Sequence, residues 1–196
     1  TGDLLAEGTY KTVTVTAGTG DVTIRRSEID ALSVTTGSGD VILEELTAAG
    51  VIRVKSTTGE QSLRRVICDE LDLDVNTGDV TLTDTVASGS IRAETTTGDV
   101  TLTRSDASTL YLKTTSGAVT GSLLTPKIFY TDTTSGTVDV PKYTEGGICE
   151  IKTTSGDVEG TLLSVKHFVA HTTSGDVHIP DSDSSAGKCT VNTTSG

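Results

Sequence analysis

A glycine recurs along this chain every 19 or 20 residues, nearly always inside the phrase Thr-Thr-Ser-Gly-Asp-Val or a close variant of it. A fixed period of this length is typical of solenoids, in which each repeat is one turn of backbone that packs on the next. Glycine at the same point of every turn indicates a tight corner with a positive φ or a close backbone approach. Gly2 and Gly196 extend the series, whose corner glycines are Gly20, Gly39, Gly59, Gly78, Gly98, Gly117, Gly136, Gly156 and Gly175.

Apolar residues fall into columns when the repeats are aligned on the corner glycine. A spacing of two residues within each pair of columns is that of a β-strand with one buried face, so each coil is predicted to hold at least two short strands. The columns two and four residues after the glycine hold Val22, Val41, Val80, Val100, Val119, Val138, Val158 and Val177, then Ile24, Leu43, Leu63, Leu82, Leu102, Val140 and Ile179. The columns seven and five residues before it hold Val13, Leu32, Ile52, Leu71, Ile91, Leu110, Phe129, Cys149, Phe168 and Cys189, then Val15, Val34, Val54, Leu73, Ala93, Leu112, Ile151, Ala170 and Val191. A third, less regular inward column ten residues before it holds Tyr10, Ile29, Cys68, Ala107, Val165 and Ala186.

Charged residues occupy the positions between these apolar columns. Stacked parallel coils lie about 4.8 Å apart, so side chains in one column are direct neighbours. A slip by one residue would bury the charges and expose the valines, which means that these columns fix the register. Lys55, Asp74, Glu94, Lys113, Asp132 and Lys152 lie four residues before the glycine, and Arg53, Asp72, Arg92, Tyr111 and Tyr130 lie six before it.

These patterns predict an all-β fold, a single-domain parallel β-helix (β-solenoid) over residues 1–196 with about ten coils of 19–20 residues. At the usual coil spacing the rod would be about 45 Å long. Right-handed coiling is favoured by analogy with known single-chain β-helices. The chain begins and ends inside the repeat, so one interpretation is a fragment of a longer protein, because solenoids need capped ends.

The composition excludes some classes of partner. The formal net charge is −12, from 27 acidic and 15 basic residues, whereas nucleic-acid binding needs clustered Lys and Arg. No apolar run is long enough to cross a membrane, so direct membrane insertion is not expected. Cys149 and Cys189 share a column two coils apart, roughly 9.6 Å, which is too far for a disulfide. With Cys68 in another column, all three cysteines are predicted to be buried free thiols.

An acidic residue follows most of the corner glycines. Stacked carboxylates at this position are candidate Ca²⁺ ligands, and the members considered for this are Asp21, Asp40, Asp79 and Asp99. The alternative is that Asp accepts backbone N–H bonds at a sharp corner, as it does in turns. We favour the second interpretation, and the sequence predicts no catalytic residue, cofactor or metal site.

Three further patterns have both a functional and a plain structural interpretation. The Ser and Thr residues before each glycine predict hydroxyl ladders, and a Thr-x-Thr array on one outward face raises ice binding as an alternative: Thr81, Thr83, Thr101, Thr103, Thr120 and Ser122. Three histidines near the C-terminal coils, His167, His171 and His178, are not expected to converge on a metal. Tyr111 and Tyr130 are expected to stack on each other, with a sugar seat as the alternative, and Tyr143 beside Gly146 and Gly147 marks a candidate contact loop.

The repeated Thr-Thr-Ser-Gly-Asp-Val phrase, with valine or isoleucine flanking it at 19–20 residue spacing from Thr1 to Gly196, resembles a bacterial family of unknown function labelled as adhesins. The resemblance implies a β-helix and a role at the cell envelope or surface. It supplies no catalytic or binding residues, and fold-level analogy is a weak basis for function.

The sequence therefore favours a non-enzymatic, adhesin-like or structural interaction module of the bacterial cell envelope, whose partner is a protein or a glycan. An alternative is a self-assembling scaffold inside the cell, because an uncapped coil exposes strand edges that allow end-to-end self-association. A carbohydrate-active β-helix enzyme is the third hypothesis.

Overall fold

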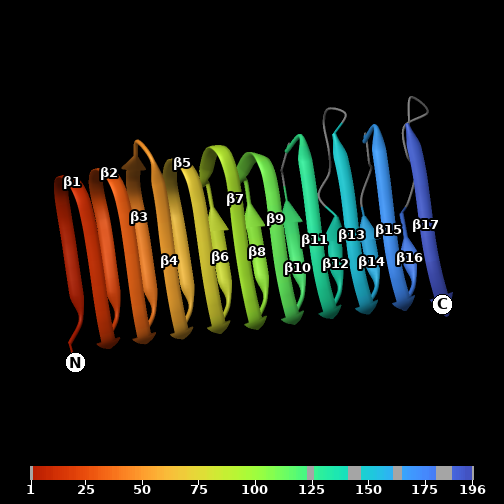
Figure 1. Cartoon of the computed structure of the whole chain (residues 1–196), viewed down its shortest axis with the longest axis horizontal. Helices are drawn as coiled ribbons and strands as arrows, with labels where there is room; N and C mark the ends of the chain where they lie inside the picture. The colour runs from red at the N-terminus through yellow and green to blue at the C-terminus, as the bar shows by residue number, and fades with distance from the viewer. Residues whose placement is uncertain (1, 123–125, 141–146, 161–164, 180–186, 196) are drawn as a thin grey trace.

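The structure is a computed structural model that describes residues 2–122, 126–140, 147–160, 165–179 and 187–195. Over these residues it contains seventeen strands and no helix, and the strands pair in parallel as one β-solenoid of about nine turns (Figure 1). The expected all-β solenoid is therefore confirmed. The strands are β1 (Leu4–Thr19), β2 (Val22–Ser38), β3 (Val41–Ala48), β4 (Val51–Thr58), β5 (Gln61–Thr77), β6 (Val80–Thr83), β7 (Val86–Thr97), β8 (Val100–Thr103), β9 (Asp106–Ser116), β10 (Val119–Ser122), β11 (Ile128–Ser135), β12 (Val138–Val140), β13 (Ile148–Ser155), β14 (Val158–Gly160), β15 (His167–Ser174), β16 (Val177–His178) and β17 (Lys188–Ser195).

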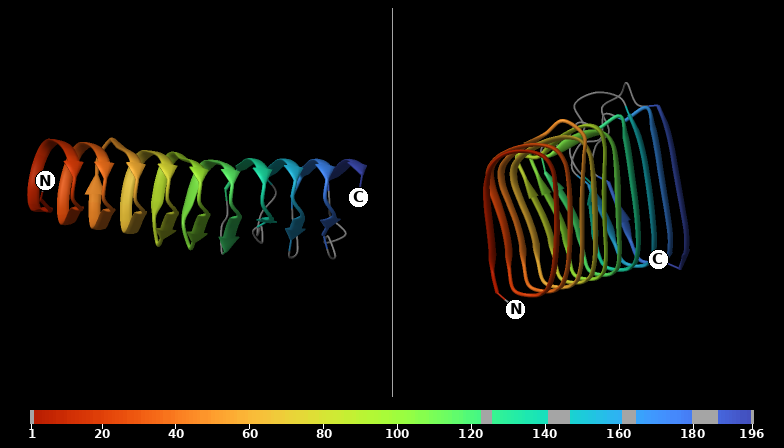
Figure 2. Two further views of the ribbon diagram at one scale, coloured as in Figure 1. Left: turned by 90° about the horizontal axis from the view of Figure 1, so that it is seen from below. Right: turned by 60° about the vertical axis from the view of Figure 1, so that its left-hand side comes forward.

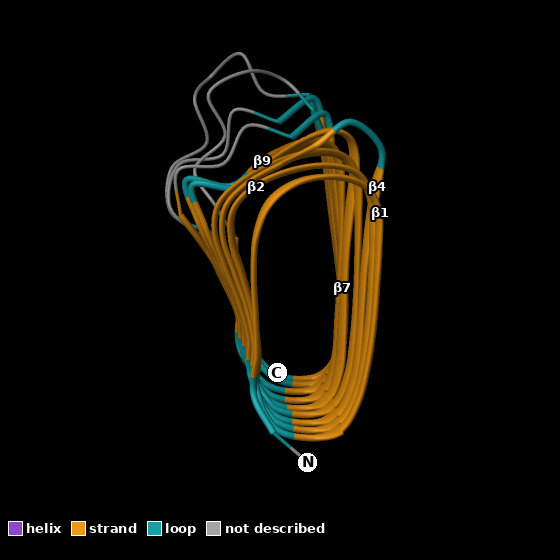
Figure 3. Ribbon diagram, turned by 90° about the vertical axis from the view of Figure 1, so that its left-hand side faces the viewer, coloured by secondary structure: helices purple, strands orange, loops and turns teal. Residues whose placement is uncertain are grey.

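Successive coils lie almost directly over one another. Viewed along the solenoid axis they follow one closed, elongated outline, with the strands on its long sides (Figure 3). Side and oblique views show the coils advancing steadily from the N-terminus to the C-terminus (Figure 2). The predicted register is observed residue by residue, as in the pairings of Ile91 with Leu110 and of Leu110 with Phe129. Repeat spacing alone was therefore enough to align the coils.

The interior is a single continuous cluster of aliphatic side chains. Valines two residues after the corner glycine are fully buried from Val22 to Val158, and the columns before the glycine are buried from Leu32 to Phe168. Because each coil contributes only a few inward side chains, its apolar face is covered only when neighbouring coils stack on it. The low aromatic content, 3%, fits this narrow core.

Three residues of the predicted inward columns are exposed, which corrects the expectation for them. Cys189, predicted to be a buried thiol, and Val191 are exposed in the last coil, and Tyr10 is 42% exposed in the first. An end coil is covered by a neighbour on one side only, so membership of an inward column does not ensure burial there. Cys68 and Cys149 are buried, as expected, and neither is in a disulfide. Ala186 and Tyr143, with Gly146 beside it, lie outside the described residues.

The predicted hydroxyl ladders are divided between the inside and the outside of the corner. In the Thr-Thr-Ser-Gly phrases between Thr114 and Gly175, the first hydroxyl residue continues the inward alternation and is buried, whereas the second and third point outward, as Thr115 and Ser116 do. In the last phrase the first residue, Thr193, is exposed. The hydroxyls of Thr95 and Thr114 each donate at 3.0 Å to the carbonyl of the corner glycine one coil earlier, Gly78 and Gly98. These bonds tie the central coils to the coils before them, whereas the buried hydroxyls of Thr36, Thr153 and Thr172 in the same column have no hydrogen-bond partner among the described residues.

Candidate functional site

The corner glycines form a backbone stack that no other residue fits. All but Gly156 have positive φ, between +113° and +155°. A Cβ added at Gly98 or Gly117 would overlap the carbonyl oxygen of the corner glycine one coil earlier. Both reasons for glycine that the sequence indicated, positive φ and close backbone approach, are therefore present at this corner.

The acidic column beside the glycines bonds to the backbone of the next coil. A side-chain oxygen of each acceptor accepts the N–H of the equivalent residue one coil later, at 2.8–3.1 Å. The donor–acceptor pairs are Asp21 to Asp3, Asp40 to Asp21, Glu60 to Asp40, Asp99 to Asp79, Ala118 to Asp99 and Asp176 to Asp157. This geometry matches the favoured interpretation of Asp as a corner acceptor. Among the residues that the structure describes, no group of three His, Cys, Asp or Glu side chains is arranged to hold a metal ion.

A second corner, six residues after the corner glycines from Gly20 to Gly98, is lined by charged residues that the sequence analysis missed. Five residues there adopt left-handed backbone with φ between 47° and 53°: Arg26, Glu45, Arg65, Asp84 and Arg104. Their charges alternate along the stack, and Arg104 contacts Asp84 through Nε at 2.5 Å and through Nη2 at 2.9 Å. The Arg104 guanidinium lowers the pKa of Asp84 by hydrogen bonding. Left-handed backbone is uncommon outside glycine, Asn and Asp, so the charge alternation was the only signal in the sequence.

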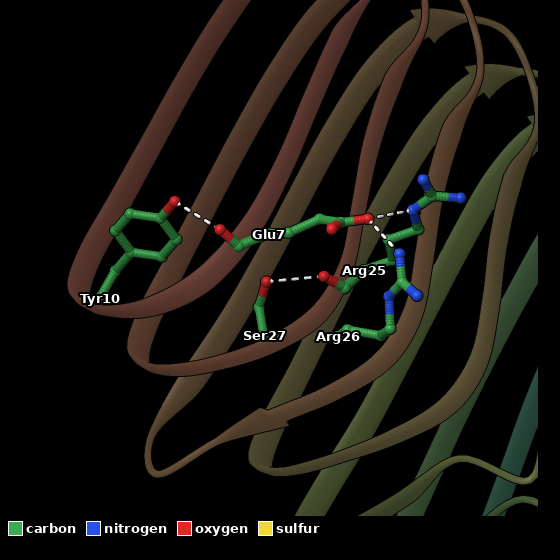
Figure 4. A network of polar contacts seen from close by, with 5 residues as sticks. All are labelled: Glu7, Tyr10, Arg25, Arg26 and Ser27. Carbon is green, nitrogen blue, oxygen red and sulfur yellow. Dashed lines mark hydrogen bonds and ion pairs between the residues drawn. The ribbon is translucent and has the colours of Figure 1, made fainter.

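The first rungs of this charged corner form a small polar network (Figure 4). Glu7 accepts hydrogen bonds from Arg25 and from Arg26, the latter at 2.6 Å, and these two bonds lower its pKa, with Arg26 the larger cause. The exposed Tyr10 hydroxyl donates to the Glu7 carbonyl at 2.7 Å. Ser27, which is buried, donates to the Arg25 carbonyl at 2.9 Å and so closes the left-handed turn.

The long outer face of the solenoid carries the aromatic pair. Tyr111 and Tyr130 stack with ring centroids 5.0 Å apart and planes 4° from parallel, which confirms the expected stacking pair. The Arg92 guanidinium lies 5.3 Å from the Tyr111 ring, and the Lys152 ammonium lies 5.1 Å from the Tyr130 ring, one coil before and one coil after the pair. Each ring face is thus covered by its partner ring or by a cation, which leaves no open platform for a sugar ring.

Ion pairs on this face run both along and across the coils. Lys55 contacts Asp74 in the next coil at 3.0 Å, and hydrogen bonding to that carboxylate raises the Lys55 pKa. Arg92 contacts Glu94 of its own strand at 2.6 Å. Exposed pairs of this kind each contribute only about 0.2–1 kcal/mol, so their main consequence is to fix register.

The three histidines do not converge. His171 shares a 3.2 Å hydrogen bond between its Nδ1 and the amide nitrogen of Asn192, one coil later in the same column. His167 lies beside Lys188 in another column. His178 is on β16, beside a hollow of about 560 Å³ that is also lined by Asp157, Glu159 and Asp176.

Comparison with known protein families assigns this chain to a family. The family model described as Toastrack DUF4097 matches residues 2–127 and again residues 103–196, so together the two matches cover almost the whole chain. The chain belongs to the Toastrack family. No curated protein and no solved structure gives a match. In the described part of this Toastrack chain, no helix is long and apolar enough to span a membrane.

Another outward column of the Toastrack coil, three residues after the corner glycine, combines hydroxyls and acids. Thr81, Thr101 and Thr120 stack in register as expected, and the column continues with Asp139 and Glu159. Partial burial, and then the neighbouring Glu159 charge, raises the pKa of Asp139. The hydroxyl array is therefore short and ends in a pair of like charges.

Proposed function

We propose that this Toastrack domain is a non-enzymatic, adhesin-like or structural interaction module of the bacterial cell envelope. Its coils form a stiff rod whose long outer faces are offered to a protein or glycan partner. The observation that carries the proposal is the direction of the polar contacts. The Asp column, the hydroxyl column and the charged second corner bond along the solenoid axis, coil to coil, and do not converge on a point in space.

Catalysis requires an acid, base or nucleophile arranged around one reacting centre. On the described surface the carboxylates of the Asp column are occupied by backbone N–H groups, and Asp84 is occupied by Arg104. The tyrosine ring faces are covered as well. A surface organised in this way supports stiffness and display more readily than group transfer.

Protease accessibility on intact cells tests the envelope assignment. The full-length protein is treated with protease on intact cells and in a lysate, with a cytoplasmic protein followed as the control for leakage. Cleavage on intact cells while the cytoplasmic control survives is the expected result, and it would justify screens against glycans and surface proteins. Protection on intact cells with cleavage in the lysate would contradict an outward-facing module and would favour an internal scaffold, which sedimentation of the purified protein would then examine.

A further inference from the structure

Exposed apolar side chains lie near the centre of the long outer face, beside a column of charged residues. We call the outward residues four, six and eight positions before the corner glycine, on β5, β7, β9, β11, β13 and β15, the tyrosine face (Figure 1). Ile128 and Ile148 are 41% and 44% exposed there and lie next to each other in register. Tyr111 and Tyr130 lie in the adjacent column. Exposed apolar side chains gathered on a flat face and bordered by charges are typical of an interaction surface.

The charges on either side of this centre have opposite arrangements. Before the tyrosines, Arg92 is in the tyrosine column and its partner Glu94 is in the next column, 2.6 Å away. After the tyrosines the order is reversed, because Glu150 is in the tyrosine column and its partner Lys152 is in the next, 2.9 Å away. Along the tyrosine column the order is therefore cation, two tyrosines, anion.

We propose that the tyrosine face binds a second copy of the same chain, face to face and antiparallel, with the two-fold axis between Tyr111 and Tyr130. Reversing the rod places Arg92 opposite Glu150 of the second copy and Glu94 opposite its Lys152. Tyr111 then lies opposite the second copy's Tyr130. A two-fold interface must be self-complementary in this way, since each residue meets the residue that mirrors it across the axis.

The complementarity extends to the neighbouring positions. Between the ion pairs, Lys113 and Asp132 are consecutive members of one column, so each lies opposite the other in the second copy. Further from the axis, the acidic Glu70 and Asp74 lie opposite His167 and His171. These assignments follow from the observed register, in which every coil contributes one residue to each column, so residues the same number of coils from the two-fold axis lie opposite each other.

A parallel arrangement of the two rods lacks this match. It would place Arg92 against Arg92 and Glu150 against Glu150 of the second copy, with like charges directly opposed. Electrostatics therefore selects the antiparallel orientation. Six coils about 4.8 Å apart and three outward columns give a contact of roughly 600 Å² per copy, which is near the lower limit for specific complexes. A weak, discrete dimer is expected at high protein concentration.

Sedimentation velocity over a concentration series tests for the dimer. The double variant Tyr111→Arg with Tyr130→Arg places four guanidinium groups around the axis and should leave only monomer. The matched control is Thr101→Arg with Thr120→Arg, which adds the same groups to the same two coils on another outward face, in the column that includes Thr81. Far-UV circular dichroism establishes that both variants are folded. A wild-type chain that stays monomeric throughout, or that forms an open series of larger species, overturns the proposal.

Charge exchange between two variants tests the register. Glu94→Lys and Lys152→Glu should each weaken self-association about tenfold, because each places like charges across both ends of the contact. An equal mixture of the two should recover an affinity within about twofold of wild type. In the mixed dimer the lysine introduced at position 94 of one copy meets the glutamate introduced at position 152 of the other, while the unchanged Lys152 meets the unchanged Glu94.

The control for register is a mixture of Glu94→Lys with Lys113→Glu, which should give no recovery. In that mixed dimer the lysine introduced at position 94 still faces Lys152, and the glutamate introduced at position 113 faces Asp132. Equal recovery in both mixtures would show attraction without this register and would exclude the antiparallel assignment.

Discussion

At the scale of single residues, contacts with the neighbouring coils determine which residue types can occupy the corner of each solenoid turn. The corner glycine leaves no space for a Cβ, and the following Asp accepts an N–H from the next coil. Residues that share a column are nevertheless not equivalent. The residues above and below each position along the solenoid axis determine its burial and the space around it. Three experiments on single residues test this.

Substitution of a central corner glycine should be severely destabilising. In Gly98→Ala the new Cβ would overlap the Gly78 carbonyl, and the backbone φ of +144° is strained for any L side chain. We expect a loss of about 2–4 kcal/mol in the free energy of unfolding, measured by chemical denaturation. Gly18→Ala is the control, because a Cβ there meets nothing within 4 Å. Equal losses in the two variants would contradict the steric explanation.

The three cysteines should differ sharply in reactivity. Burial raises the pKa of the Cys68 thiol to about 12, with nearby Asp69 as a smaller cause, so it has almost no thiolate at neutral pH. Cys149 is buried and Cys189 is exposed. Brief alkylation of the folded protein, followed by peptide mass spectrometry, should label Cys189 alone, and unfolding should make all three reactive. Rapid labelling of Cys68 in the folded chain would be inconsistent with this core.

Removal of one charge from the Asp139–Glu159 pair should stabilise the protein. The pKa of Asp139 is raised in the folded state, so stability falls as the pH rises from the ordinary Asp value through the folded-state pKa. Asp139→Asn should therefore gain roughly 0.3–0.5 kcal/mol at neutral pH, a small value because the group is largely solvated. The gain should vanish in acid, where Asp139 is protonated in both states. Thermal unfolding at the two pH values measures it, and a gain of the same size in acid would rule out this origin.

At the scale of the strand and its corners, the alternation of apolar residues predicted most of the buried columns. It did not predict the buried column three residues before the corner glycine, because that column consists mainly of Thr. Thr114 and Thr133 continue the alternation of the columns before the glycine, but because Thr is polar they were predicted as part of a hydroxyl ladder along the corner and not as core residues. The charged corner was missed because Arg and Glu give no sign of left-handed backbone. Alternating charges such as Arg65 and Asp84, six residues after the corner glycines from Gly20 to Gly98, were the available signal. Cys189 was misplaced because a column does not show whether both neighbouring coils cover it.

Backbone conformation should matter more than the ion pair at the charged corner. Asp84 has a φ of 51°, which Asn adopts readily and a β-branched residue does not. Asp84→Val should lower the melting temperature by several degrees, whereas Asp84→Asn should stay within about 2 °C of wild type. The pKa of Asp84 is lowered by Arg104, so the pair contributes above the ordinary Asp pKa and is lost as the pH falls through the folded-state value. Equal melting temperatures for the Val and Asn variants would show that the left-handed corner carries no strain.

At the scale of the whole molecule, the solenoid is a stack of near-equivalent units whose stability comes from contacts between neighbours. Removal of one complete coil should therefore leave a folded protein. Deletion of residues 79–98 joins Gly78 to Asp99 and keeps every column in register, since both glycines occupy the same corner. The deletion also removes Asp84, which places Arg65 next to Arg104. We expect retained β-sheet circular dichroism, a rod about 4.8 Å shorter by small-angle X-ray scattering, and a lower melting temperature that salt partly restores by screening the two arginines.

Deletion of residues 79–88 is the control. It removes half a coil, displaces each later inward residue from its column, and should abolish folding. If both deletions fold equally well, stacking in register is not what holds this solenoid together.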